Sequence, residues 1–93
     1  MFQTLNYLAG QWREEVKFTS SIDEMISHPC YQAIITIGIP AIPFLLKELQ
    51  ERPDHWFAAL EAITGDDPVD PGDLGDIRKM TEAWLRWGQQ HGY

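Results

Sequence analysis

The chain has 93 residues, 44% of them hydrophobic and 23% charged, which is the composition of one small globular domain. Its 14 Asp and Glu against seven Lys and Arg give a net charge of −7, which excludes the basic surface that direct nucleic-acid binding requires. The single cysteine excludes an intramolecular disulfide and favours a cytoplasmic protein, and the longest apolar stretch is too short and too interrupted to span a membrane.

The first third of the chain predicts two short helices. A partial helical spacing of apolar residues favours a helix over about residues 11–17. The pattern also allows this helix to begin on the N-terminal side of Gly10. Ser20 and Ser21 each precede a carboxylate by three residues, close to the capping-box pattern, which predicts a second helix over residues 22–27. We expect this second helix to bury Ile22, Met25 and Ile26.

Proline and glycine residues mark two further helices in the middle of the chain. Pro29 suits the first turn of a helix, and Gly38 ends that helix because glycine accepts a positive φ. Residues 34–37 also have strand propensity, but the helical patterns on both sides favour a helix. Regular hydrogen bonding in the next helix begins near Pro43 and stops at Pro53. Its outward residues are expected to be Lys47, Glu48, Gln50 and Glu51.

The last two helices flank an acidic loop. Asp54 is expected to cap a helix that ends at Gly65, and residues 66–75 form a loop with two prolines and two glycines. The apolar face of the first of these helices is predicted to hold Trp56, Phe57, Leu60 and Ile63. The final helix, over about residues 76–90, has an apolar stripe at alternating three- and four-residue steps: Ile77, Met80, Trp84 and Trp87.

These elements predict an all-α fold, with about five short helices in a single domain over residues 1–93. Sequential helices with short connections pack antiparallel, which favours helical hairpins. The side chains expected in the core are Ile34, Ile35, Ile42, Leu45, Leu46, Leu49, Phe57, Leu60, Ile63, Ile77, Met80, Trp84 and Trp87.

The turn and helix that begin at Gly38 resemble part of a HEAT-type repeat. The residues that carry this resemblance are Gly38, Pro40, Ala41, Ile42, Pro43, Leu45, Leu46 and Leu49. A second set is similar to the closing unit of bacterial HEAT-repeat proteins: Ala59, Leu60, Ile63, Thr64, Gly65, Asp67, Trp84 and Trp87. The resemblance implies a HEAT-like hairpin over about residues 29–90, like a short right-handed α-α superhelix, and by analogy a role in protein binding. The N-terminal third departs from the repeat.

Nearly the whole chain also resembles a family of short uncharacterised bacterial proteins. The residues that carry this second resemblance are Trp12, Ser20, Ser21, His28, Pro29, Tyr31, Gln32, Pro53, Asp54, Trp56, Phe57, Gly92 and Tyr93. It implies no activity.

Two groups of residues could in principle carry chemistry. The loop carboxylates Asp66, Asp67, Asp70, Asp73 and Asp76 could bind Ca²⁺, but they lack the ligand spacing of an EF-hand, so we interpret them as turn-forming and capping residues. The possible zinc ligands are His28, Cys30, His55 and His91, and only the first two are close in sequence. Cys30 with a histidine could form a nucleophile and base, but no oxyanion motif accompanies them. We therefore predict no catalytic residue, metal or cofactor.

The leading hypothesis is a non-catalytic protein-interaction module, such as an accessory, immunity or antitoxin-like subunit of a bacterial complex. Trp56 fits either the core or an exposed edge. The candidate partner-binding residues are Arg52, His55, Trp56, Asp66, Asp67, Asp70 and Asp73. Two alternatives stay open. One is an acidic nucleic-acid mimic that inhibits a DNA-binding protein, and the other is a small metal- or ligand-binding enzyme that uses the His28, Cys30 and His55 region or the loop over residues 66–76.

Overall fold

The computed structural model describes residues 2–93, and every regular element within them is helical. The prediction of an all-α fold is therefore confirmed. The α-helices are α1 (Phe2–Val16), α2 (Ile22–Ser27), α3 (Pro29–Ile37), α4 (Ile42–Glu51), α5 (Phe57–Thr64) and α6 (Ile77–Gln90). Two short 3₁₀ turns, η1 (Ile39–Ala41) and η2 (Pro71–Asp73), precede α4 and α6.

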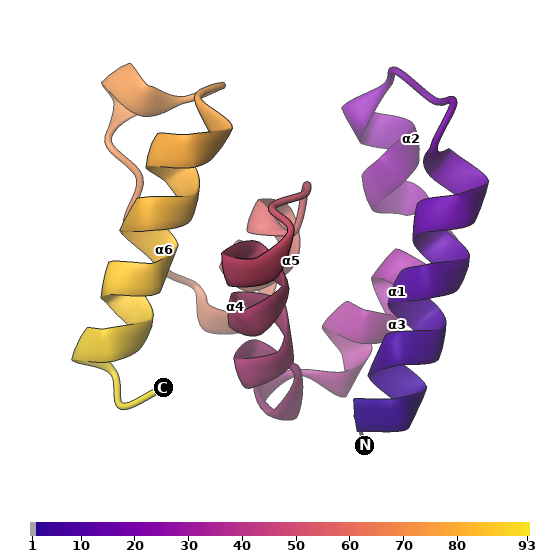
Figure 1. The fold of residues 1–93 in the computed structure, drawn as a ribbon, viewed down its shortest axis with the longest axis horizontal. Helices are drawn as coiled ribbons and strands as arrows, with labels where there is room; N and C mark the ends of the chain where they lie inside the picture. The colour runs from indigo at the N-terminus through magenta and orange to yellow at the C-terminus, as the bar shows by residue number, and fades with distance from the viewer. Residues whose placement is uncertain (1) are drawn as a thin grey trace.

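The helices form a layered arrangement with α4 and α5 in the middle. Figure 1 shows α6 along one side of the molecule, α1 and α2 along the other, and α4 and α5 between them. The most extensive packing is between α1 and α3, between α3 and α5, and between α4 and α6. The N-terminal three helices and α6 are thus held on opposite sides of the central pair.

Local capping signals set most helix ends as predicted. The Ser21 hydroxyl accepts a hydrogen bond from the Glu24 N–H at 3.3 Å, and α2 has the expected bounds. Gly38, after α3, and Gly65, after α5, both have a positive φ, at 80° and 75°. Asp76 caps α6 by accepting from the Lys79 N–H at 3.1 Å.

The first helix is longer than the predicted range and takes the earlier start that the pattern allowed. It runs from Phe2, and its buried residues, which are spaced three or four apart, are Leu5, Ala9, Trp12 and Val16. Gly10 lies within it, at a cost of about 1 kcal/mol relative to alanine. Packing of the long apolar face against α3 offsets that cost, because tertiary burial supplies most helical stability in proteins.

Two predictions at the ends of the central helices are wrong. The Asp54 carboxylate accepts from the N–H of its neighbour His55 at 2.8 Å, and α5 begins only at Phe57, so Asp54 does not cap that helix. Glu48 was expected to face solvent, yet it is only 5% exposed. Its carboxylate lies 2.7 Å from Nη2 of Arg13 on α1, and this ion pair stabilises the buried charge.

Most of the predicted core is buried, with four exceptions. Ile77 is 39% exposed, while Ile35, Ile63 and Met80 are only partly buried. Helix α2 was expected to bury three apolar residues, but Ile22 is 51% exposed and Met25 and Ile26 are only partly buried.

The centre of the core is an aromatic cluster that the pattern analysis did not predict. It consists of Trp12 on α1, Tyr31 on α3 and Trp56 at the start of α5, and each of the three is fully buried. The Trp56 ring centroid lies 4.5 Å from that of Trp12 and 5.4 Å from that of Tyr31. The Tyr31 hydroxyl donates to the His55 carbonyl at 2.7 Å and accepts from the Ala59 N–H at 3.0 Å, so it fixes the start of α5.

Candidate functional site

An apolar groove with a volume of about 340 Å³ lies between α2, α5 and the beginning of α6. We call it the α2–α5–α6 groove. The apolar side chains that line it are Ile22, Ile26, Phe57, Ala58, Ile77 and Met80. His55 and Glu61 supply its polar side chains. Figure 1 shows α5 between α6 and α2.

The groove exists because α6 is covered along only part of its length. Towards its C-terminal end, α6 packs on α4, where Trp84 and Trp87 are buried. Gly88 allows this close approach, since a Cβ added there would lie 2.8 Å from Cδ1 of Leu46. The same apolar stripe continues to Met80, which is half-buried, and Ile77, which is exposed. The beginning of α6 therefore presents an exposed Ile77 and an incompletely covered Met80.

The opposite wall of the groove, α2, is attached by two side-chain hydrogen bonds and by partial burial of Met25 and Ile26. None of its six residues is fully buried. Trp12 Nε1 donates to the Met25 carbonyl at 2.8 Å, and Gln32 Nε2 donates to the Ile26 carbonyl at 2.9 Å. These bonds fix the backbone of α2 and leave Ile22 at the mouth of the groove.

The charges around the groove are asymmetric. Helices α2 and α5 carry Asp23, Glu24 and Glu61, all of them exposed, and neither helix contains a Lys or Arg. The α6 wall carries Arg78 and Lys79 instead, and Lys79 Nζ lies 3.7 Å from the Asp73 carboxylate. The α2 and α5 sides of the groove are therefore acidic, whereas the α6 side has mixed charge.

The residues predicted to form a partner surface around Trp56 do not come together. Trp56 is fully buried in the aromatic cluster, so its placement on an exposed binding edge is corrected to the core. Arg52 is exposed, and its Nε lies 3.6 Å from the Glu48 carboxylate. Only His55 of these three lines the α2–α5–α6 groove.

The aspartates of the acidic loop have structural partners. Asp66 accepts from Nε1 of Trp87 at 2.9 Å, and Asp67 accepts from the Val69 N–H at 3.2 Å. Asp73 pairs with Lys79, Asp76 caps α6, and Asp70 is exposed. These contacts support the interpretation of the loop carboxylates as turn-forming and capping groups. Within residues 2–93, no group of three or more His, Cys, Asp or Glu side chains is placed to hold a metal ion.

His28 caps the start of α3 through the backbone of Cys30. His28 Nδ1 accepts a hydrogen bond from the Cys30 backbone N–H at 3.0 Å, and Nε2 lies 2.7 Å from Oε1 of Glu15. Because Nδ1 accepts, we assign the ring proton to Nε2, which donates it to Glu15. Hydrogen bonds from His28 and from Gln11 lower the pKa of Glu15.

Cys30 is expected to react slowly with thiol reagents. Burial, followed by the charge of Glu15, raises the pKa of the Cys30 thiol, so less thiolate is present at neutral pH. We expect the native protein to react with 5,5′-dithiobis(2-nitrobenzoate) more slowly than the urea-unfolded protein, with a rate that increases as the pH rises. Equal rates in the two states would contradict this prediction.

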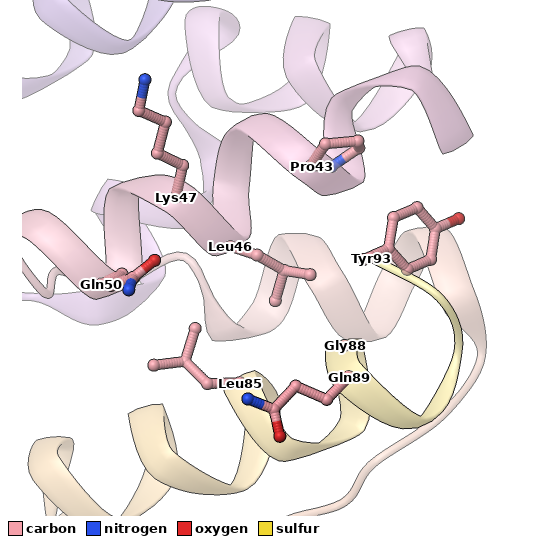
Figure 2. A pocket seen from close by; sticks show the side chains of 8 residues that line it. All are labelled: Pro43, Leu46, Lys47, Gln50, Leu85, Gly88, Gln89 and Tyr93. Carbon is pink, nitrogen blue, oxygen red and sulfur yellow. The ribbon is translucent and has the colours of Figure 1, made fainter.

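A second hollow lies between α4 and α6, with a volume of about 260 Å³. Figure 2 shows Leu46 and Leu85 between the two helices and Lys47 directed away from them. The amides of Gln50 and Gln89 also line it. This hollow is smaller than the α2–α5–α6 groove, and more of its lining side chains are polar. We therefore regard the groove as the candidate binding site.

Comparison with known proteins adds no family to this description. No protein-family model matches the chain, and neither the curated proteins nor the solved structures contain a match. In residues 2–93, no single helix has the length and apolar character of a membrane span, although the bent pair formed by Pro29–Ile37 and Ile39–Glu51 meets those two criteria jointly.

Pattern analysis placed the two most exposed isoleucines of the groove in the core. Ile22 and Ile77 both continue an apolar helical stripe, and periodicity alone does not distinguish a covered stripe from an uncovered one. A usable signal was the length of α2, since a helix of six residues covers little apolar surface.

Proposed function

We propose that this protein is a non-catalytic protein-interaction module that binds the apolar face of a partner's amphipathic helix in the α2–α5–α6 groove. The observation that carries the proposal is the convergence of aliphatic side chains from three helices on one open groove. Contiguous exposed apolar surface on a small globular domain is typical of interaction sites. A role as a small subunit of a larger complex, of the accessory, immunity or antitoxin type, is consistent with this activity.

A helix is the form of partner that fits such a groove. Amphipathic helices bind apolar grooves through anchors spaced at i, i+3, i+4 and i+7. The apolar anchors offered by the protein lie on two walls, Ile22 and Ile26 on α2 and Ile77 and Met80 on α6, with α5 between them. An apolar stripe inserted between the walls would complete the burial of the exposed beginning of α6.

Substitution of Ile77 tests the proposal. The probe is a synthetic amphipathic peptide of about 15 residues, the length at which isolated helices become marginally stable, with one leucine stripe and lysine on its other faces. We expect Ile77→Asp to weaken peptide binding at least about 10-fold, because burial of an isoleucine contributes roughly 1.5–3 kcal/mol. Fluorescence anisotropy of the labelled peptide measures the affinity.

Ile39→Asp is the matched control. Ile39 is 66% exposed and lies on η1, outside the lining of the groove. It should leave peptide binding unchanged, and circular dichroism should show that both variants remain folded. Equal loss of affinity in the two variants, or no binding of the peptide to the native protein, would overturn the proposed function.

A further inference from the structure

We infer that the partner helix is basic on one flank, and that this flank faces α2 and α5 when the helix lies in the groove. The inference rests on the proposed function, because it specifies the partner and its orientation at the same site. The observation that carries it is the asymmetry of the charges around the groove.

Helices α2 and α5 carry three exposed carboxylates, of which only Glu61 lines the groove. Glu61 lines the groove directly, and Asp23 and Glu24 follow the groove residue Ile22 in the first turn of α2. Neither α2 nor α5 contains a basic residue that could neutralise these carboxylates from within the same helix. A Lys or Arg side chain on the bound helix would be attracted to these carboxylates and would reduce the repulsion between them.

The opposite side of the groove does not select for basic residues. Arg78 follows the groove residue Ile77, and Lys79 precedes Met80. This wall carries both signs of charge, because Asp76 precedes Ile77 and Lys79 Nζ lies 3.7 Å from the Asp73 carboxylate, so it attracts a basic flank less than the acidic side does. The two sides of the groove therefore distinguish the two flanks of an amphipathic helix and fix its rotation about its own axis.

The same charge asymmetry argues against a second copy of this chain as the occupant. The chain has a net charge of −7, and two copies meeting at the acidic side of the groove would repel one another. A basic partner would be attracted to this acidic protein at long range, and this attraction would increase the rate of association. The occupant with the best charge complementarity is therefore a different, basic protein segment.

Two peptides and two protein variants test this inference. Both peptides have about 15 residues and share the leucine stripe, but one carries lysine and the other glutamate along the same single flank. We expect the lysine peptide to bind at least about 10-fold more tightly, and to lose most of that advantage as ionic strength rises from about 0.05 to 0.5 M. Glu61→Lys should weaken binding of the lysine peptide about 3- to 10-fold.

Glu51→Lys is the matched control because it makes the same change in net charge. Glu51 is exposed at the end of α4 and does not line the groove. It should change binding of the lysine peptide much less than Glu61→Lys does. An equal effect of the two variants would show that only the overall charge matters, and would overturn the inference.

The remaining outcomes separate the inference from the proposed function. Equal affinity for the two peptides, with binding still lost in Ile77→Asp, would overturn the charge inference and leave the helix-binding function in place. Failure of both peptides to bind would overturn the proposed function. A native dimer that becomes a monomer in Ile77→Asp, measured by light scattering, would identify a second copy as the occupant and also overturn the inference.

Discussion

Trp56→Ala is expected to lower the free energy of unfolding by about 4 kcal/mol, since removal of a fully buried tryptophan costs roughly 3–5 kcal/mol in lost burial and cavity formation. Trp56 is fully buried and stacks on Tyr31 at an interplanar angle of 11°. Its contacts with Trp12 and Tyr31 connect α5 with α1 and α3. A domain of this size has a total stability of about 5–15 kcal/mol, so the variant should lose a large share of it. Urea denaturation followed by far-ultraviolet circular dichroism measures the change.

Two further variants define what the tryptophan contributes. Phe18→Ala is the surface control, because Phe18 is 92% exposed, and it should hardly change the urea midpoint. Trp56→Phe should cost less than Trp12→Phe. Trp12 Nε1 donates to the Met25 carbonyl, so phenylalanine at position 12 removes a hydrogen bond. No acceptor within residues 2–93 reaches Nε1 of Trp56, so phenylalanine at position 56 removes none. A midpoint for Trp56→Ala close to that of Phe18→Ala would contradict the burial of Trp56.

Several helix ends could be predicted from the sequence because they depend on residues a few positions apart. The Ser21 hydroxyl and the Asp76 carboxylate each reach an N–H three residues ahead, and Gly38 and Gly65 adopt a positive φ within their own turns. Each of these signals is contained in a few consecutive residues. These ends therefore followed from local chemistry, whereas the starts of α1 and α5 depend on tertiary packing.

The aromatic cluster could not be predicted in the same way because its members are distant in sequence. Trp12 and Trp56 meet only because α1 packs on α3 and α3 packs on α5. Helical spacing left Trp56 open to either the core or an exposed edge. Trp56 precedes the first residue of α5, so helical spacing does not restrict it, and its side chain is buried.

The candidate site was missed for a related reason. Periodicity identified the apolar stripe of α6 correctly, but which part of a stripe is covered depends on where the neighbouring helix ends. Here α4 covers Trp84 and Trp87 and leaves Ile77 exposed. Of the residues predicted to bind a partner, His55 lies in the groove, although the sequence had associated it with Trp56 rather than with α2 and α6.

Arg13→Met is expected to destabilise the protein by about 2–3 kcal/mol. Arg13 Nη2 lies 2.7 Å from Oε1 of Glu48, whose side chain is only 6% exposed, so the substitution removes the closest counter-charge from a buried carboxylate. Removal of one partner from a fully buried ion pair costs about 3–5 kcal/mol. The effect should be smaller here, because Arg13 is 29% exposed and because Arg52 Nε, 3.6 Å from the same oxygen, still faces Glu48. Urea denaturation measures the loss.

The double variant Arg13→Met/Glu48→Met distinguishes an ion pair from simple packing. If the cost of Arg13→Met comes from an uncompensated buried charge, removal of that charge should restore much of the stability, because apolar side chains of similar volume often replace buried ion pairs without loss. Lys17→Met is the surface control, since Lys17 pairs with Glu14 at 3.2 Å where both side chains are at least half exposed. A double variant no more stable than Arg13→Met would show that the buried charge is not the cause of the loss. A loss in Arg13→Met no larger than that in Lys17→Met would mean that α1 and α4 are not joined by this pair in solution.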